Sequence, residues 1–306
     1  MKWTSDNIEH LDGKIIIVTG ANSGLGYYTT LELAKKGATV VMACRNVLKA
    51  ESAANSIKAE VKNAQLDIRK LDLADLESVN SFAANFMKDY TKLDVLINNA
   101  GLMAIPESRT KQGFEMQFGT NHLGHFALTL QLAEVFTQTK NSRIVTISSL
   151  VHKMGEINFT DLNWNSSYKK WAAYGQSKLA NLMFAIELNR RLKDKGHPTI
   201  SLAAHPGYAD TNLQTKGAVI EGSGFKKAIY SFANVLLAQP AAMGALPGLY
   251  AATAPDAKGG KYYGPEKLGG LWGYPREEKI NETKVDPEVA RKLWDVSEKM
   301  TGIKFT

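Results

Sequence analysis

Short apolar runs alternate with helical patterns through the first two thirds of the chain, and this alternation limits the possible folds more than any other feature. Each run is continuously apolar, which predicts a strand buried on both faces of a sheet. The runs occupy residues 15–20, 38–44, 93–98, 143–148 and 199–205, with a weaker one at 65–71. The helical patterns between them supply the crossovers that parallel strands need. The sequence therefore predicts an α/β fold, a doubly wound parallel sheet of the Rossmann type.

The chain shows no repeat, linker or low-complexity block that would divide it. Its length of 306 residues suits one or two domains. We expect residues 1–306 to form a single domain, with a core at about 12–265 and a C-terminal extension at 266–306.

The pattern changes after the sixth strand. Residues 212–235 mix glycine, charged and aromatic residues, and we interpret them as a segment that covers the substrate, with an ordinary surface excursion as the alternative. Further on, Asp286 and Pro287 predict the N-cap and first residue of a helix that ends near Met300.

Composition narrows the cellular setting and the partners. Cys44 is the only cysteine, so an intramolecular disulfide is impossible and a reducing cytoplasm is expected. The net charge is +7, but Lys and Arg are scattered among acids, which argues against a nucleic-acid partner. No apolar run approaches the roughly 18 residues of a membrane span, so we expect no span, secretion signal or anchor.

A glycine-rich turn follows the first strand. Gly20, Gly24 and Gly26 lie in the segment TGANSGLG, directly before the first helical pattern. A backbone without Cβ atoms, at the positive end of a helix, can receive a pyrophosphate. The spacing GxxxGxG differs from the common GxGxxG. We interpret the turn as a dinucleotide-binding site, with a tight structural turn as the alternative.

The residues after the second strand bear on the choice of cofactor. An NAD-selective site usually places an acid there, on the ribose hydroxyls. Here the sequence reads Ala43-Cys44-Arg45-Asn46, and an arginine can pair with a 2′-phosphate. We expect NADP to be preferred, with NAD possible as a cofactor; the alternative makes Arg45 a solvent-exposed cap of the next helix.

Tyr174 and Lys178 stand four residues apart in a helical pattern, so they share one helix face. The Lys178 ammonium can stabilise the ionised phenol of Tyr174, whose pKa we expect to fall toward neutral pH. Such a phenol is a usable acid or base. A pair with this spacing also arises by chance in many helices. The interpretation as an active site therefore depends on the glycine turn upstream as well.

With these motifs placed, the chain resembles the short-chain dehydrogenase/reductase family over roughly residues 12–265. The matching features are the glycine turn, Asn98-Asn99-Ala100-Gly101, Asn121, Ser148-Ser149, Tyr174-x-x-x-Lys178 and HPGYADT. The resemblance implies a nicotinamide cofactor held by Gly20, Asn22, Ser23, Gly24, Leu25, Gly26, Arg45, Asp72, Leu73, Asn98, Ala100, Gly101, Tyr174, Lys178, Pro206, Gly207 and Thr211. Within this set, Asp72 and Leu73 would flank the adenine.

Reduction of a carbonyl by hydride leaves an alkoxide, so the site needs an acid and a polarising donor. Tyr174 is the candidate acid. Ser148 and Ser149 face opposite sides of their strand and cannot both be the donor. The family resemblance selects Ser149, gives Lys178 a second role on the nicotinamide ribose, and makes Asn121 the holder of a water that links Lys178 to solvent protons.

The interval between Ser149 and Tyr174 is 25 positions, longer than in most members of the family. Together with ACRN, TNHLGHF and Leu150-Val151-His152, it resembles the retinol dehydrogenase-like branch. That branch also includes WW-domain oxidoreductases and, more distantly, light-dependent protochlorophyllide reductases. The chain lacks the membrane anchor of many animal retinol enzymes, so a retinoid substrate does not follow from the resemblance.

Other side-chain groupings are weaker. His122 and His125 lie three apart, but no carboxylate or thiol cluster completes a metal site, so we expect no metal and interpret both as packing or capping residues. His205 is expected to be a structural or cofactor-side residue. The aromatic segments at 261–264 and 271–274 fit either a substrate slot or the core.

The sequence thus predicts an NADP-preferring oxidoreductase acting on a ketone, an aldehyde or the matching alcohol, with an apolar or bulky small-molecule substrate. Two alternatives stay open: a non-catalytic sensor or scaffold that binds NADP, and light-driven reduction of a tetrapyrrole ring. Substrate identity, reaction direction and the number of subunits are left undetermined by the sequence.

Overall fold

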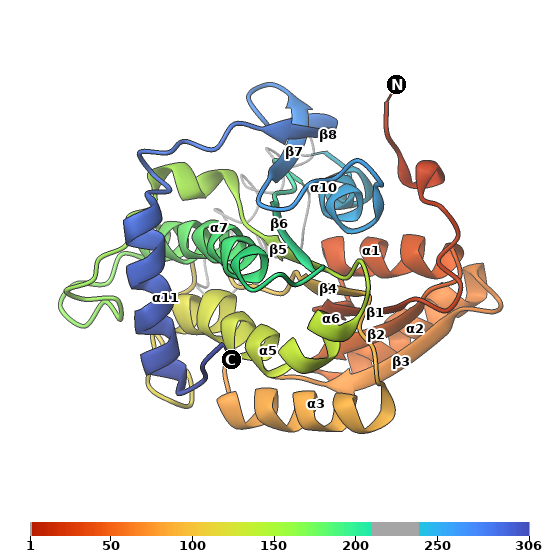
Figure 1. Cartoon of the computed structure of the whole chain (residues 1–306), viewed down its shortest axis with the longest axis horizontal. Helices are drawn as coiled ribbons and strands as arrows, with labels where there is room; N and C mark the ends of the chain where they lie inside the picture. The colour runs from red at the N-terminus through yellow and green to blue at the C-terminus, as the bar shows by residue number, and fades with distance from the viewer. Residues whose placement is uncertain (1, 210–238, 306) are drawn as a thin grey trace, which may run out of the picture.

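The computed structural model describes residues 2–209 and 239–305 and confirms the predicted α/β fold (Figure 1). One sheet runs through the molecule in the order β3-β2-β1-β4-β5-β6-β7-β8. The six predicted strands are all present and pair in parallel. They are β1 (Ile15–Thr19), β2 (Thr39–Cys44), β3 (Gln65–Lys70), β4 (Val95–Asn98), β5 (Arg143–Ile147) and β6 (Ile200–Ala204).

Two further strands, which the sequence did not predict, extend the sheet. Strand β7 (Tyr262–Lys267) pairs in parallel with β6, and β8 (Trp272–Glu278) returns antiparallel to form the edge. Pro265 and Pro275 face each other in this hairpin, next to a bulge. Proline is confined to edges and bulges because it cannot donate to the ladder, which hid these strands from pattern reading. The sheet therefore continues beyond residue 265, where the sequence placed the end of the core.

Helices cover both faces of the sheet, as alternating side chains require. Ile16 and Val18 of β1 join one apolar cluster, whereas Ile17 joins the other. Helices α1 (Gly24–Lys35), α2 (Val47–Glu60) and α10 (Ala241–Thr253) pack on the first face. The second face carries α3 (Leu76–Asp89), α5 (Gly124–Gln131), α6 (Ala133–Gln138) and α7 (Lys170–Asp194).

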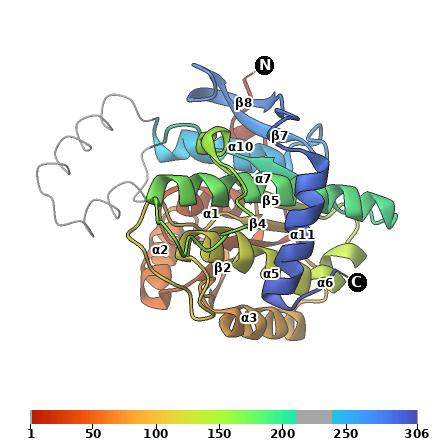
Figure 2. The same cartoon turned by 90° about the vertical axis from the view of Figure 1, so that its left-hand side faces the viewer.

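The C-terminal helix α11 (Pro287–Thr301) confirms the prediction made from Asp286 and Pro287. The Asp286 carboxylate accepts hydrogen bonds from the backbone of Glu288 at 2.6 Å and Val289 at 3.3 Å, and the helix ends before Gly302. This helix packs on the outside of α7 and α5, beyond the three layers formed by the sheet and the helices on its two faces (Figure 2).

The long helical pattern at 113–136 is interrupted. It divides into α4 (Met116–Phe118), the π-helical turn η2 (Gly119–Leu123), α5 and α6. A π-helical turn inserts one extra residue per turn and is often found at functional sites. Asn121 lies in the middle of this turn. Short 3₁₀ helices also occur at Ser5–Asn7 (η1) and Leu150–Met154 (η3).

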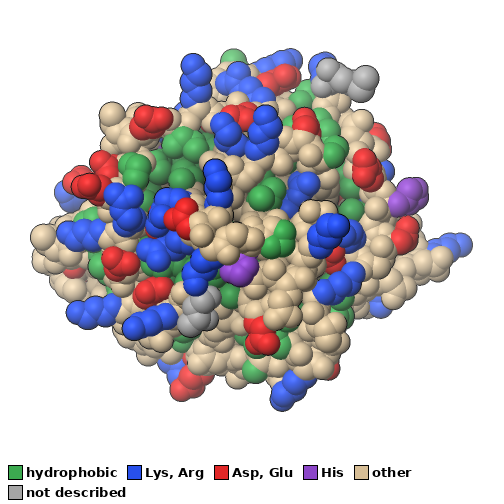
Figure 3. All heavy atoms as spheres, in the orientation of Figure 1, with side chains coloured by type: hydrophobic (Ala, Val, Ile, Leu, Met, Phe, Trp, Pro, Cys, Tyr) green, Lys and Arg blue, Asp and Glu red, His purple; other side chains and the backbone are tan. Residues whose placement is uncertain are grey.

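Two surface properties follow from the structure. On the face drawn in Figure 3, lysine and arginine side chains are interspersed with acidic ones. Within residues 2–209 and 239–305, no helix is both long enough and apolar enough to cross a bilayer.

Candidate active site

A cavity of about 670 Å³ opens at the carboxyl ends of the parallel strands. It spans the position where the strand order reverses between β1 and β4, which is where open α/β sheets bind ligands. Its wall is formed by residues that follow β1, β2, β3, β4, β5 and β6, together with the start of α7 and the turn before β8. Segments far apart in sequence therefore meet in one site.

The glycine turn forms one end of the cavity. Gly20 and Gly24 have φ angles of 67° and 54°, which favour glycine, and a Cβ on Gly26 would overlap the Gly20 carbonyl oxygen. Ser23 is the N-cap of α1, yet its side chain makes no capping hydrogen bond. The first N–H groups of α1 are thus available to an anion. Asn22, Ser23 and Leu25 also line this end, which fits the phosphates of a dinucleotide.

Arg45 lines the same cavity on the far side of the turn. Asn46, not Arg45, caps α2, because its side chain accepts a 2.9 Å hydrogen bond from the Lys49 backbone. Lys49 lies in the first turn of α2 and also lines the cavity. Sequence reasoning missed Lys49, because Arg45 precedes the N-cap Asn46 and the two residues share no helix face that their spacing could reveal. Asp72 and Leu73 form the neighbouring wall, and their contact with the adenine stays a prediction.

The Asn98-Asn99-Ala100-Gly101 segment divides into two roles. Ala100 and Gly101 line the cavity as expected, but Asn98 does not. Asn98 is fully buried and donates to Thr129 at 3.0 Å, so it braces the sheet against α5. Asn99 lines the cavity instead, and its amide donates to the Thr19 carbonyl at 2.7 Å. The structure thus places Asn99, and not the predicted Asn98, at the cavity wall.

Ser149, Tyr174 and Lys178 line the opposite end of the cavity. The Ser149 hydroxyl accepts a 3.3 Å hydrogen bond from the backbone of Val151, which leaves its own proton free to donate. It also lies near enough to the Tyr174 hydroxyl to lower the pKa of that phenol. Ser148 also lines the cavity, but its hydroxyl donates to the Lys178 carbonyl at 2.7 Å. The two serines thus have different partners, as their opposite directions on the strand predict.

The expected pKa of Tyr174 is wrong for the chain without cofactor. Burial raises the pKa of Tyr174 to about 12, against a smaller opposing effect of the Ser149 hydrogen bond. Burial also lowers the pKa of Lys178 to about 8. The Lys178 ammonium lies 5.9 Å from the centre of the Tyr174 ring and donates to the Ile147 carbonyl at 3.1 Å. Desolvation therefore outweighs the attraction between the pair.

Asn121 does not line the cavity, but it hydrogen-bonds the backbone of Leu102, which does. Its amide donates to the Leu102 carbonyl at 2.9 Å and to Ser177 at 2.9 Å, and its oxygen accepts from the Leu102 backbone at 2.7 Å. A Cβ on Gly101 would lie 3.1 Å from the Asn121 oxygen and 3.6 Å from the Lys178 ammonium, so these groups crowd together. The π-helical turn brings Asn121 beside Lys178, and its role in a water relay stays a prediction.

The long interval between Ser149 and Tyr174 folds tightly over α7. Gly155 packs directly on the backbone of Gly175, where a Cβ would overlap the Gly175 oxygen. The next residue of the helix, Gln176, accepts from the Asn158 backbone at 3.2 Å and donates to the Leu162 carbonyl at 3.0 Å. The extension is thus fixed to the residues immediately after Tyr174, and Ser149 and Tyr174 meet despite their separation.

The remaining predicted residues divide between the wall and the core. Pro206 and Gly207 line the cavity, whereas Thr211 and the segment 212–235 lie outside the described residues. Of the aromatic segments, Tyr262 and Tyr263 are buried in the core, while Leu271 reaches the cavity from the turn before β8. Sequence reasoning also missed several wall residues with no local signal, namely Leu102, Met103, Ala104 and Trp171.

The two histidines of η2 and α5 have structural partners. His125 contacts Thr19 at 2.9 Å through one ring nitrogen and the Asn121 carbonyl at 2.9 Å through the other. His122 contacts Ser297 of α11 at 2.9 Å. Among the described residues, no cluster of three metal-ligating side chains occurs. Both rings are buried and have these side-chain or backbone partners, which fits their interpretation as packing or capping residues.

Known proteins share this arrangement. The family model for short chain dehydrogenases matches residues 14–218. Retinol dehydrogenase 14 of Mus musculus is 42% identical over 305 residues, covering 96% of this chain and 87% of that protein. Retinol dehydrogenase 13 of Homo sapiens is 42% identical over 297 residues, covering 96% and 86%. A crystal structure of an uncharacterised protein from Mycobacterium paratuberculosis, 42% identical, superposes with a TM-score of 0.82 over 100% of both chains.

These matches confirm the resemblance drawn from the motifs. The chain belongs to the short-chain dehydrogenase/reductase family, in its retinol dehydrogenase-like branch, and is an NAD(P)-dependent oxidoreductase acting on CH–OH groups.

Proposed function

We propose that this oxidoreductase prefers NADP and interconverts a ketone or aldehyde with its alcohol on an apolar or bulky small molecule. The observation that carries the proposal is the continuity of one cavity. The same cavity holds a phosphate-binding glycine turn at one end and the hydroxyls of Ser149 and Tyr174 at the other. A cofactor that spans this distance presents its reactive end to both hydroxyls.

The side chains divide the work as follows. The Tyr174 phenol stays protonated at neutral pH, because burial raises its pKa to about 12, and this is the form that donates a proton during reduction. The Ser149 proton polarises the carbonyl oxygen. When bound, the nicotinamide supplies or accepts the hydride, and its oxidised ring carries a positive charge. In the reverse reaction the Tyr174 phenol would have to lose its proton, and a positive charge next to it would favour the ionised form.

The preference for NADP rests on the charge at the adenosine end. Arg45 and Lys49 both line the cavity after β2. A guanidinium and an ammonium are suited to the doubly charged 2′-phosphate that distinguishes NADP from NAD. The chain has Arg45 at the position where an NAD-selective site usually carries an acid.

The substrate class follows from the wall around the reacting hydroxyls. Leu102, Met103 and Leu150 line the cavity, as do Trp171 and Leu271 at its mouth. An apolar wall with two convergent hydroxyls is suited to an apolar molecule that carries one polar group. Retinal enters the first substrate panel because relatives of this chain are named retinol dehydrogenases.

Turnover is tested by NADPH oxidation against a panel of aldehydes and ketones that includes retinal. We expect at least one carbonyl to be reduced by the wild type, and Tyr174→Phe to lower kcat by about 100-fold or more while NADPH still binds. Tyr250→Phe is the matched control, since Tyr250 lies on α10 and does not line the cavity. Binding of NADPH without turnover of any carbonyl would favour the sensor instead.

Cofactor preference is tested separately. Arg45→Asp should shift the ratio of kcat/KM for NADPH to that for NADH by about tenfold or more toward NADH. Lys58→Asp makes the same charge change on the exposed last turn of α2, outside the cavity. An unchanged ratio in Arg45→Asp would show that the assignment of the 2′-phosphate is wrong.

A further inference from the structure

We propose that His152 is a positioning residue that sets the direction of the Ser149 hydroxyl, and that Tyr262 holds His152 in place. The inference rests on the proposed function, because it assigns Ser149 the role of carbonyl donor. Neither His152 nor Tyr262 lines the cavity. Both act through the backbone at the end of β5.

His152 closes a short hydrogen-bonded turn with Ser149. Its ring nitrogen Nδ1 lies 2.6 Å from the Ser149 carbonyl oxygen, and its backbone N–H donates to the same oxygen at 3.0 Å. A carbonyl only accepts, so Nδ1 must carry the proton. This fixes His152 as the Nδ1–H tautomer. Two donors on one carbonyl lock the peptide plane that follows Ser149.

That plane controls the serine side chain. Ser149 is the N-cap of η3, with extended backbone angles of −159° and 157°, and its hydroxyl accepts from Val151 in the first turn of this helix. If the first turn of η3 loosens, the Val151 N–H moves away from the Ser149 hydroxyl. The hydroxyl then loses the hydrogen bond that holds its oxygen toward the backbone and its proton toward the cavity. The His152 bond therefore acts on the reactive geometry of Ser149 from outside the cavity.

Tyr262 brings β7 into the same network. Its hydroxyl oxygen lies 3.3 Å from His152 Nδ1. The His152 Nδ1–H therefore donates mainly to the Ser149 carbonyl and more weakly to the Tyr262 hydroxyl oxygen. On the other side of the same strand end, Ser148 donates to the Lys178 carbonyl at 2.7 Å.

The position of the Tyr262 ring is itself fixed by two imidazoles. It meets His152 edge-on at 5.3 Å and His205 at 5.0 Å between ring centres. His205 occupies space that a Cβ on Gly264 would fill, and its Nε2 lies 3.2 Å from a Glu278 carboxylate oxygen. The β7–β8 hairpin thus packs against the segment that follows β5 and carries Ser149, on the side away from the cavity. Tyr262 is 1% exposed and His152 is 5% exposed, so water does not replace these bonds.

The first test is a double-mutant cycle on kcat. His152→Leu should lower kcat by about 10- to 100-fold, with the Kd for NADPH unchanged, because misplacement of a reacting group costs rate more than binding. Since His152 acts through Ser149, the same change in a Ser149→Ala background should cost almost nothing further. His152→Asn should restore most of the rate, because the asparagine amide can donate near the position of Nδ1.

Two further variants guard against a folding artefact. Tyr262→Phe removes one oxygen from the network and should lower kcat less than His152→Leu, by about three- to tenfold. Met154→Ala changes an exposed side chain of the same 3₁₀ helix and should leave kcat unchanged. Equal losses from His152→Leu with and without Ser149 would overturn the proposal, as would failure of His152→Asn to exceed His152→Leu.

A second measurement does not depend on turnover. Long-range ¹H–¹⁵N spectra report which nitrogen of a histidine carries the proton, and His152→Asn identifies the signal. The Nδ1–H tautomer is expected, and protonation at Nε2 alone would contradict the proposal. If the wild type reduced no carbonyl while this tautomer was observed, the proposed function would fail and the structural assignment of His152 would stand.

Discussion

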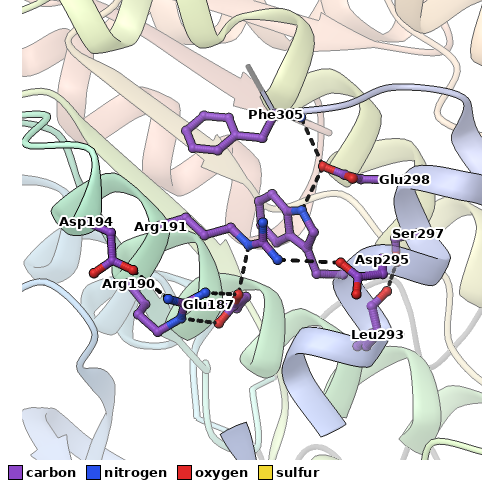
Figure 4. A network of polar contacts seen from close by, with 10 residues as sticks. Glu187, Arg190, Arg191, Asp194, Leu293, Asp295, Ser297, Glu298 and Phe305 are labelled. Atoms are coloured by element: carbon purple, nitrogen blue, oxygen red, sulfur yellow. Dashed lines mark hydrogen bonds and ion pairs between the residues drawn. The ribbon is translucent and has the colours of Figure 1, made fainter. Parts of the chain in front are cut away.

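Helix α7 buries two charged side chains nine residues apart and surrounds them in opposite ways. Lys178 is 5% exposed and Glu187 is 3% exposed. Glu187 receives two hydrogen bonds from Arg190, at 2.7 and 2.8 Å, and one from Arg191 at 2.8 Å (Figure 4). Among the described residues, Lys178 forms no ion pair; its contacts are the Ile147 carbonyl and the Tyr174 ring.

The surroundings explain the pKa values. Burial raises the pKa of Glu187, but the hydrogen bonds from Arg190 and Arg191 outweigh it and hold the pKa below its ordinary value. At Lys178, burial acts without a counter-ion and lowers the pKa to about 8. Helix α7 therefore pairs the charge of Glu187, near its contact with α11, and leaves the charge of Lys178 unpaired beside the hydroxyls of Ser149 and Tyr174. A buried charge without a partner costs stability and is typical of a functional site.

The network around Glu187 is structural. Arg191 also reaches Asp295 of α11 at 3.6 Å and stacks at 4.4 Å over Trp294, whose indole N–H donates to Glu298 at 2.8 Å. Figure 4 shows these side chains filling the contact between α7 and α11. Loss of Glu187 should therefore weaken the fold and spare the chemistry, whereas loss of Lys178 should do the reverse.

The largest expected effect is that of Lys178→Met on activity. We predict that kcat falls by about 1,000-fold, because the site loses the positive charge beside Tyr174 and, under the proposed function, the residue assigned to the nicotinamide ribose. In the absence of cofactor, the variant should be more stable than the wild type at pH 7, by up to about 3 kcal/mol. Urea unfolding and kcat are measured on the same preparations. If Lys178→Met lost stability together with activity, the contrast between an unpaired Lys178 and a paired Glu187 would be wrong.

Glu187→Gln should have the opposite signature. We expect a loss of about 2 kcal/mol in the free energy of unfolding, since the substitution weakens several charge-assisted bonds to a buried group. The kcat should stay within about twofold of the wild type. Asp295→Asn is the control, because Asp295 is 72% exposed and its pair with Arg191 should contribute less than about 0.5 kcal/mol. Equal losses in both variants would show that burial of Glu187 does not matter.

The smallest effect concerns pH. Below about pH 8, Lys178 is charged in both the folded and the unfolded chain, and the folded chain bears the full cost of burial. Between about pH 8 and its ordinary pKa of 10.5, the unfolded chain binds more protons than the folded one, so stability due to Lys178 rises with pH. The stability gap between Lys178→Met and the wild type should thus narrow by about 1 to 2 kcal/mol from pH 8 to 9.5. A constant gap would contradict the unpaired state of Lys178.

The fold was predictable from sequence where local patterns decide it. Strands β1, β2, β4, β5 and β6 are continuous apolar runs because both faces of the sheet are covered there, whereas the edge strand β3 is half-buried and gave a weaker signal. The cap at Asp286 is a local signal. Helix α10 was missed because Pro247 lies inside it and its buried residues are small, including Gly244 and Ala245. A Cβ on Gly244 would overlap Ala209 and Leu25, so close packing with distant residues, not an amphipathic pattern, defines this helix.

The site was predictable where spacing fixes geometry and not where burial decides chemistry. Tyr174 and Lys178 share a helix face by their spacing alone. The depth at which α7 lies determines their pKa values, and no local pattern reports that depth. The exchange of Asn98 for Asn99 arose because the family motif does not say which amide faces the cavity. The roles of His152 and Tyr262 depend on the β7–β8 hairpin, which the sequence concealed.

The most direct test of the account is single-turnover oxidation of bound NADPH by an accepted carbonyl, recorded for the wild type, Tyr174→Phe and Glu187→Gln. The account predicts that all three bind NADPH equally. It further predicts that Glu187→Gln transfers hydride at the wild-type rate and that Tyr174→Phe is slower by about 100-fold or more. Hydride transfer at the wild-type rate in Tyr174→Phe would show that this phenol is not the proton donor.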